Sequence, residues 1–182
     1  SRHRDNRFVS HNVELLISRP VILYRARDLL RSVVTPSSAV QVCPLELGFA
    51  TLPVTRPVLE GIKKYVGMGL VPKVSGAKRL YFGAGWRYDD QSIHVLGRWL
   101  SLDGPVAYVE TNYFGGSGDQ GAVVWARHQR VFGPARAEEN VIHEALALLG
   151  DEVRSSADRF EALGLGSRRS SDGFARAGAE LL

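Results

Sequence analysis

The sequence is poor in cysteine and lacks long apolar runs, and both features limit the kinds of protein that it can be. Its 182 residues include one cysteine, Cys43. A single cysteine excludes an internal disulfide framework and fits a reducing compartment. No apolar run approaches the roughly 18 residues that a membrane-spanning helix requires. We therefore expect a cytoplasmic protein that does not associate with membranes.

The N-terminal segment lacks the features of a secretory signal. Residues 1–7 are basic, and the first apolar stretch is interrupted at Ser18-Arg19-Pro20. A signal peptide needs an uninterrupted apolar core of about 7 to 15 residues, so we do not interpret this end as one. Residues 1–11 are expected to form a flexible basic extension. Because residue 1 is Ser and the only methionine is Met68, we expect the chain to be a piece of a longer protein.

The composition is that of an ordinary globular domain. Hydrophobic residues make up 45% of the chain and charged residues 23%, far from the disordered and fibrous extremes. A chain of this length buries roughly two thirds of its unfolded surface and needs no metal or disulfide to fold. Since no repeat or linker interrupts the sequence, we expect one domain over residues 12–165. Residues 166–182 are expected to form a tail that is either frayed or a short helix.

Apolar periodicity predicts an α+β fold. Three to four helices are expected to pack on a mainly antiparallel sheet of about five strands. The helices are predicted to begin at Pro20, after Thr55, after Asp89 or Asp90, and near Val141. The extended segments are residues 12–17, 39–43, 49–52, 106–114, 122–126 and 130–132. We expect the last three to form a meander that Gly133-Pro134 ends.

The charge is divided unevenly along the chain. Residues 1–88 contain 14 Lys and Arg against 5 Asp and Glu, whereas residues 89–182 contain 9 against 14. One segment of the basic half interleaves basic and aromatic side chains, an arrangement that can stack bases and neutralise phosphates. Its members are Lys73, Lys78, Arg79, Tyr81, Trp86 and Arg87. The alternative is a surface loop that its aromatic residues hold against the core.

A glycine-rich reversal joins the two strongest strand segments and is the most distinctive feature of the sequence. Glycine permits positive φ angles and close approach of another backbone or a ligand. One interpretation is a loop that binds a protein partner or a small polar ligand. The other is a hairpin whose turn geometry alone demands glycine. The candidate binding residues are Glu110, Asn112, Tyr113, Phe114, Gly115, Gly116, Gly118, Asp119 and Gln120.

Residues 104–125 contain GPVAYVE, then YFGG, then a Gly, a Gln and VVW. This pattern resembles a family of small uncharacterised bacterial proteins. Residues 44–55 and 158–166 are similar to the same family, whereas residues 1–11 and 67–87 are not. The resemblance implies no catalytic residue and no cofactor. It implies that the chain binds a partner protein, in the way that a bacterial immunity protein binds its toxin.

Catalytic and metal-binding signatures are weak throughout the sequence. No P-loop, dinucleotide-binding loop or serine-hydrolase elbow is present. His143-Glu144 could begin a zinc-binding helix, in which two histidines four residues apart bind the metal. Position 147 is Ala, so the second histidine is missing. Cys43 is expected to be a buried, inert thiol. We assign no catalytic residue, metal ligand or cofactor.

Three functions remain open, in this order. The first is protein binding through the hairpin at 110–120, and the second is nucleic-acid binding through the basic half. The third is an enzyme that uses Glu110 and Asp119 as a carboxylate pair at the hairpin mouth.

Overall fold

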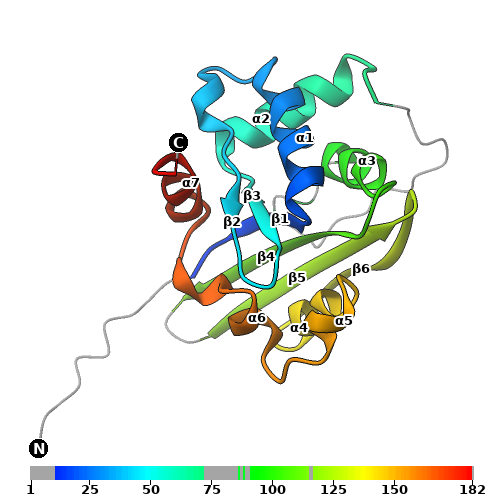
Figure 1. Ribbon diagram of the computed structural model, residues 1–182, viewed down its shortest axis with the longest axis vertical. Coiled ribbons are helices and arrows are strands. Elements are labelled where there is room, and N and C mark those ends of the chain that lie inside the picture. The colour runs from blue at the N-terminus through cyan, green and yellow to red at the C-terminus, as the bar shows by residue number, and fades with distance from the viewer. Residues whose placement is uncertain (1–10, 72–85, 87, 89–90, 115–116, 182) are drawn as a thin grey trace, which may run out of the picture.

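The computed structural model describes residues 11–71, 86, 88, 91–114 and 117–181. Within these residues the strands form one six-stranded antiparallel sheet in the order β2-β3-β1-β4-β5-β6 (Figure 1). The strands are β1 (Glu14–Ser18), β2 (Cys43–Pro44), β3 (Ala50–Pro53), β4 (Val106–Phe114), β5 (Ser117–Ala126) and β6 (Gln129–Ala137).

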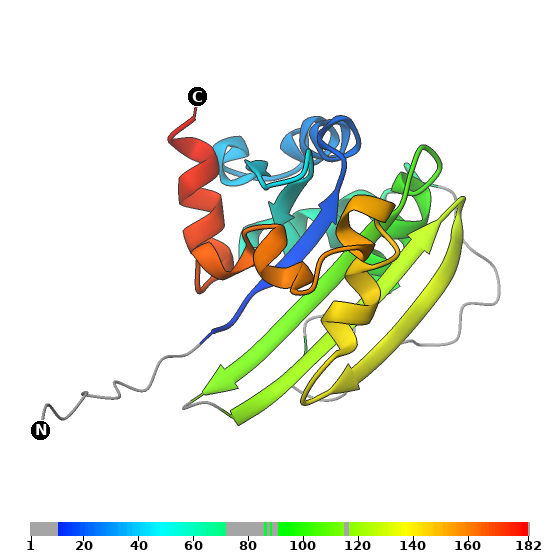
Figure 2. The same cartoon turned by 60° about the horizontal axis from the view of Figure 1, so that its bottom comes forward.

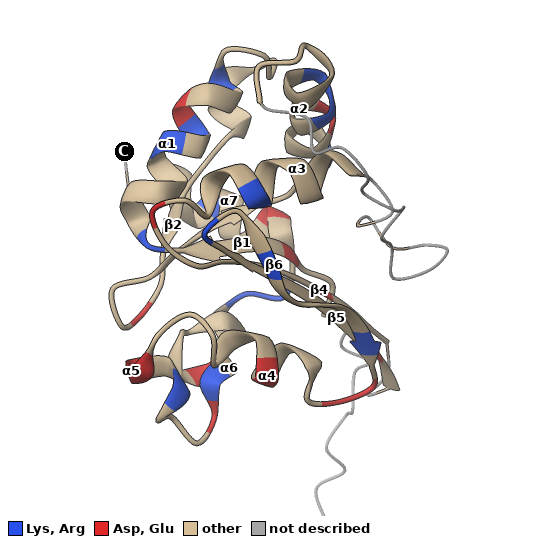
Figure 3. Cartoon of the chain, turned by 90° about the vertical axis from the view of Figure 1, so that its right-hand side faces the viewer, with Lys and Arg blue, Asp and Glu red and all other residues tan. Residues whose placement is uncertain are grey.

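Helices cover both faces of the sheet (Figure 3). The first layer consists of α1 (Pro20–Arg31), α2 (Arg56–Gly67) and α3 (Gln91–Leu100). The second layer consists of the short helices α4 (Val141–Leu146), α5 (Asp151–Arg154) and α6 (Arg159–Ala162). The last helix, α7 (Ser171–Ala179), packs against β2 and β3. Two 3-10 turns, η1 (Ser37–Ala39) and η3 (Leu165–Ser167), complete the described elements.

The sheet separates two apolar cores. Successive side chains of a strand point to opposite faces, so β4 contributes Tyr108 to the core beneath α1–α3 and Val109 to the core beneath α4–α6. β5 likewise gives Trp125 to the first core and Val124 to the second. The alternation determines which side chains of the hairpin can meet.

The predicted α+β architecture with an antiparallel meander is confirmed. The predicted end of the meander is wrong, since β6 continues through Gly133 and Pro134 to Ala137. Gly133 adopts a φ of +70°, and a Cβ atom there would lie 2.2 Å from the carbonyl oxygen of Ala122. Proline has no backbone N–H and cannot donate a hydrogen bond to a neighbouring strand. It is tolerated here because β6 lies at the edge of the sheet, where no partner strand needs that donor. The pairing with β5 shifts register in this region.

The chain ends are placed as follows. Residues 1–10 of the predicted basic extension lie outside the described residues, whereas His11 bridges Tyr113 of β4. Of the two forms predicted for residues 166–182, the structure contains the helix. Phe174 of α7, the red helix in Figure 2, is only 1% exposed, so the core continues past residue 165. No helix of the described part is long and apolar enough to cross a membrane.

Candidate functional site

The β4–β5 hairpin extends beyond the cores and presents two different faces. The ladder pairs Asn112 with Asp119 and Thr111 with Gln120. Residues directly opposite each other share a face, and their neighbours in the strand share the other one. The candidate residues therefore divide. Glu110, Asn112, Phe114 and Asp119 lie on the α1–α3 side, and Tyr113 and Gln120 lie on the α4–α6 side.

On the α1–α3 side, both carboxylates have partners. Glu110 is 4% exposed, and the Tyr108 hydroxyl donates a hydrogen bond of 2.7 Å to its Oε2. Asp119 accepts a hydrogen bond of 2.8 Å from Nε of Arg136 on β6. The two carboxylates do not face each other in the ladder, because Glu110 is opposite Gly121. The arrangement gives no support to a catalytic carboxylate pair.

Glu110 and Asn112 also line a pocket of about 430 Å³ between β1, β4 and the N-terminal ends of α2 and α7. We call this the Asn112 pocket. Glu14 of β1 lies opposite Glu110 in the ladder, and the Ser171 hydroxyl donates a hydrogen bond of 2.6 Å to the Glu14 carboxylate. Since Ser171 belongs to α7, this bond ties the terminal helix to β1.

The end of the hairpin exposes an aromatic ring. Phe114 is 70% exposed, although the preceding residues of β4 up to Thr111 are buried. Gly118 lies opposite Tyr113, and a Cβ atom at position 118 would lie 2.1 Å from the carbonyl oxygen of Asn112. The close backbone approach requires glycine at this position. Gly115 and Gly116 lie outside the described residues.

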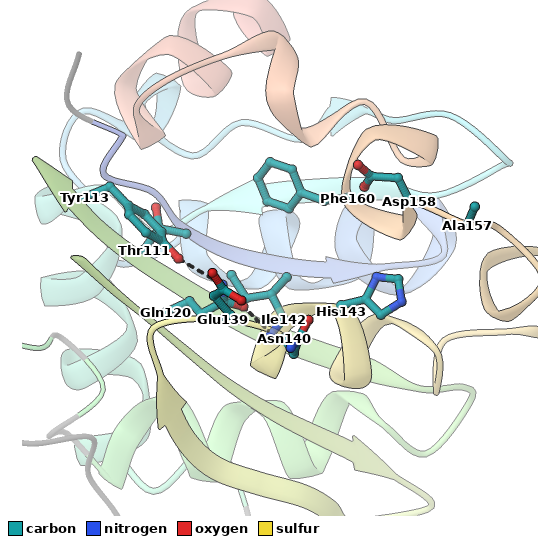
Figure 4. A pocket seen from close by; sticks show the side chains of 10 residues that line it. All are labelled: Thr111, Tyr113, Gln120, Glu139, Asn140, Ile142, His143, Ala157, Asp158 and Phe160. Carbon is teal, nitrogen blue, oxygen red and sulfur yellow. Dashed lines mark hydrogen bonds between the residues drawn. The ribbon is translucent and has the colours of Figure 1, made fainter. Parts of the chain in front are cut away.

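A larger pocket, of about 550 Å³, opens on the α4–α6 side (Figure 4). Its floor belongs to the hairpin, and its other walls come from α4, the segment before α4, and residues 157–160. We call it the Gln120 pocket. Its lining residues are Thr111, Tyr113, Gln120, Glu139, Asn140, Ile142, His143, Ala157, Asp158 and Phe160.

Gln120 fixes the floor of this pocket through three hydrogen bonds. Its side-chain nitrogen donates to the Tyr113 hydroxyl at 2.9 Å and to the Glu138 carbonyl at 3.3 Å. Its side-chain oxygen accepts a bond of 2.7 Å from the Ile142 amide. The Tyr113 hydroxyl in turn donates to the Glu138 carbonyl at 2.7 Å. The hairpin and the start of α4 are thereby held in one geometry.

His11 supports the same wall from the N-terminal side. Its Nδ1 lies 2.9 Å from the Thr111 hydroxyl, and its ring meets that of Phe160 edge-on at 5.7 Å. Its Nε2 is buried without a hydrogen-bond partner among the described residues. Burial lowers the pKa of His11 below its usual value. The imidazole therefore favours the neutral form in the folded protein.

Two of the residues that line the Gln120 pocket, Glu139 and Asp158, are acidic, and none is Lys or Arg. Figure 3 shows acidic residues in the segment that leads into α4. Among the described residues, Glu139 and Asp158 form no ion pair with Lys or Arg. The nearby Arg159 directs its guanidinium to the carbonyl oxygens of His143 and Arg154. It therefore lies beside the pocket and binds the backbone near the C-terminal ends of α4 and α5.

Other candidates have the following positions. No group of three His, Cys, Asp or Glu suited to a metal ion occurs among the described residues. Cys43 is buried, and burial raises the pKa of its thiol, which disfavours the reactive thiolate. Trp86 is 4% exposed, and the Arg136 guanidinium lies 5.2 Å from its ring centroid. Its ring is thus covered rather than presented to a base. The remaining basic-aromatic candidates, Lys73, Lys78, Arg79, Tyr81 and Arg87, lie outside the described residues.

The chain matches no protein-family model, no curated protein and no solved structure. The geometry of the site therefore carries the functional argument.

Sequence reasoning identified Tyr113 and Gln120 but missed the residues that complete their pocket. Glu139 and Asn140 come from a segment that carries no recognisable motif, Phe160 belongs to a segment noted for its resemblance alone, and His11 lies 100 residues before its partner Thr111. The alternation of side chains along β4 and β5 could have separated the hairpin candidates into two faces. No local pattern could have indicated the distant wall.

Proposed function

We propose that this chain is a protein-binding module of the immunity type, and that the end of the β4–β5 hairpin forms part of its contact surface. The observation that carries the proposal is the exposure of Phe114 at the end of the β4–β5 ladder, next to Asn112 and Tyr113, which line two pockets. Aromatic residues are enriched at the centres of protein interfaces, where one buried ring can supply much of the binding free energy.

The edge of the sheet supports contact through side chains rather than through added strands. β6 is the exposed edge beside the hairpin, and it carries Arg130, Arg136, Pro134 and a shift in register. Charges, proline and bulges on an edge strand disfavour pairing with another chain. A partner is therefore expected to meet the hairpin end and the walls of the pockets.

The resemblance of residues 104–125 to small bacterial proteins suggests the kind of partner, namely a toxin that the immunity protein neutralises. The partner's own gene is then expected to lie next to the gene for this chain. The carboxylates of Glu110 and Asp119 both accept hydrogen bonds from side chains of this chain. These bonds favour a binding role over an enzyme that uses the two carboxylates.

Affinity capture tests the proposal. Tagged protein is used to retrieve the product of the adjacent gene, with Phe114→Ala as the test variant and Val21→Ala as the control. Val21 is also an exposed apolar side chain, 74% exposed on α1, away from the hairpin. We expect Phe114→Ala to weaken capture by roughly tenfold or more, and Val21→Ala to capture as well as the wild type.

Two results would count against the proposal. One is an absence of binding by the wild type, and the other is equal capture by Phe114→Ala and the wild type. A gel-shift assay with nucleic acid at low salt tests the nucleic-acid alternative, because binding to phosphates weakens steeply as salt is added. Retardation of the nucleic acid at low salt, without capture of the adjacent gene product, would favour that alternative.

A further inference from the structure

We infer that the Gln120 pocket receives the guanidinium group of an arginine side chain from the protein partner. The inference rests on the proposed function and deepens it, since it names the side chain that the partner contributes. Ligand pockets typically enclose roughly 300 to 1,000 Å³, and the volume of about 550 Å³ falls within that range.

The walls of the pocket match a planar cation. The rings of Tyr113 and Phe160 line it, and Figure 4 places Phe160 across the cavity from Gln120 and Glu139. Arginine stacks on aromatic faces and binds carboxylates through a rigid fork of N–H donors. The carboxylates of Glu139 and Asp158, both of which line the pocket, supply acceptors. None of the ten lining residues is Lys or Arg, and the adjacent Arg159 directs its guanidinium to the backbone carbonyl of His143 at 3.1 Å, without forming an ion pair with Glu139 or Asp158 among the described residues.

The acceptors are already oriented. Oδ1 of Asp158 accepts a hydrogen bond of 3.0 Å from the Glu161 amide at the start of α6, which fixes the carboxylate. The Gln120 bonds to Tyr113 and Ile142 fix the opposite wall. A cavity whose groups do not reorganise loses less conformational entropy when it binds a ligand.

The pocket adjoins the proposed contact surface at the end of the hairpin. Tyr113 lines the pocket on one face of β4, and the next residue, Phe114, is exposed on the other face. A partner that covers both faces of the hairpin end therefore reaches the pocket mouth. The absence of ion pairs at Glu139 and Asp158 within the described chain makes the mouth complementary to a basic segment of the partner.

An NMR titration of the full chain with N-acetyl-arginine amide tests the inference. We expect saturable shifts of the Ile142 backbone amide and of the Gln120 side-chain amide at millimolar concentrations. The neutral isostere N-acetyl-citrulline amide should produce little change, because it keeps the shape and loses the charge.

Three variants locate the binding. Glu139→Gln and Asp158→Asn should each weaken binding of the arginine amide by roughly two- to fivefold, as expected for a partly exposed ion pair. Asparagine also accepts the hydrogen bond at the helix start, so Asp158→Asn should leave α6 intact. The matched control is Glu144→Gln, an exposed carboxylate on α4 that does not line the pocket, and it should bind as the wild type does.

The inference is overturned if the arginine amide causes no saturable shift, if the citrulline amide binds equally well, or if Glu144→Gln weakens binding as much as Glu139→Gln. Capture of the partner by a chain that does not respond to the arginine amide overturns this inference alone. A response to the arginine amide with no capture of any partner overturns the proposed function.

Discussion

The indole N–H of Trp125 donates a hydrogen bond of 3.1 Å to Nδ1 of His94 inside the core beneath α3. The Tyr88 hydroxyl lies 3.3 Å from the same nitrogen. Since Nδ1 acts as an acceptor, the imidazole is neutral in the folded protein. Burial, helped by the charges of Arg98 and Arg130, lowers the pKa of His94 to about 4.

This hydrogen bond predicts a loss of stability in mild acid. The unfolded chain binds a proton at His94 near pH 6.5, whereas the folded chain resists protonation until about pH 4. Stability is therefore fully present above pH 6.5 and decreases as the pH falls toward 4. We expect His94 to contribute about 2 to 3 kcal/mol to this decrease. Urea unfolding of the wild type at pH 7, 5.5 and 4.5 measures it.

The matched variants are His94→Asn and His128→Asn. His128 is exposed and has a φ of +61°, a conformation that asparagine tolerates. The pH dependence should become smaller in His94→Asn and remain as in the wild type in His128→Asn. An unchanged pH dependence in His94→Asn would contradict the assignment.

A second prediction concerns two helical glycines. A Cβ atom at Gly97 would lie 2.5 Å from the ring of the fully buried Trp125, whereas one at Gly67 would meet nothing within 4 Å. Gly97→Ala should destabilise the protein by about 1 to 3 kcal/mol because the core is overpacked. Gly67→Ala should be neutral or stabilising by up to about 1 kcal/mol. Thermal unfolding of both variants makes the comparison, and equal melting temperatures would refute it.

The third prediction concerns the end of the hairpin. In Gly118→Ala, the new methyl group would contact the Asn112 carbonyl oxygen at 2.1 Å, so the strands must separate locally. We expect a cost of about 1 to 3 kcal/mol and faster hydrogen exchange at the Gln120 amide. Ser117→Ala, one residue away and exposed, is the control. Wild-type exchange rates in Gly118→Ala would show that the ladder does not need glycine there.

The fourth prediction concerns the terminal helix. Phe174 is 1% exposed, and Leu181 is 67% exposed. Phe174→Ala should cost about 3 to 5 kcal/mol because it leaves a cavity in the core beneath α4–α6. Leu181→Ala should change stability by no more than about 0.5 kcal/mol. Urea unfolding at pH 7 gives both values, and a neutral Phe174→Ala would mean that α7 does not stabilise the domain.

The sequence predicted most of the fold because its elements carry strong local signals. The β-branched and aromatic run of residues 106–114 matches β4, and Pro20 marks the start of α1. Gly133-Pro134 misled the prediction of β6, because these residues end most strands but are tolerated at a sheet edge.

The site was less predictable than the fold. The hairpin stood out through its glycines, and Tyr113 and Gln120 were identified with it. Their separation from Glu110 and Asn112 follows from strand alternation. The wall formed by Glu139 and Phe160 depends on how α4 and α6 pack on the sheet, and periodicity along the chain does not encode that packing.

The wall opposite the hairpin also determines how binding could be blocked. A synthetic peptide copying residues 104–126 would carry the whole glycine-rich motif and the exposed ring of Phe114. It would lack Glu139, Asp158 and Phe160, which close the cavity around Gln120. We expect such a peptide to be a poor decoy for the proposed partner, since a useful competitor would have to reproduce a folded surface assembled from distant parts of the chain.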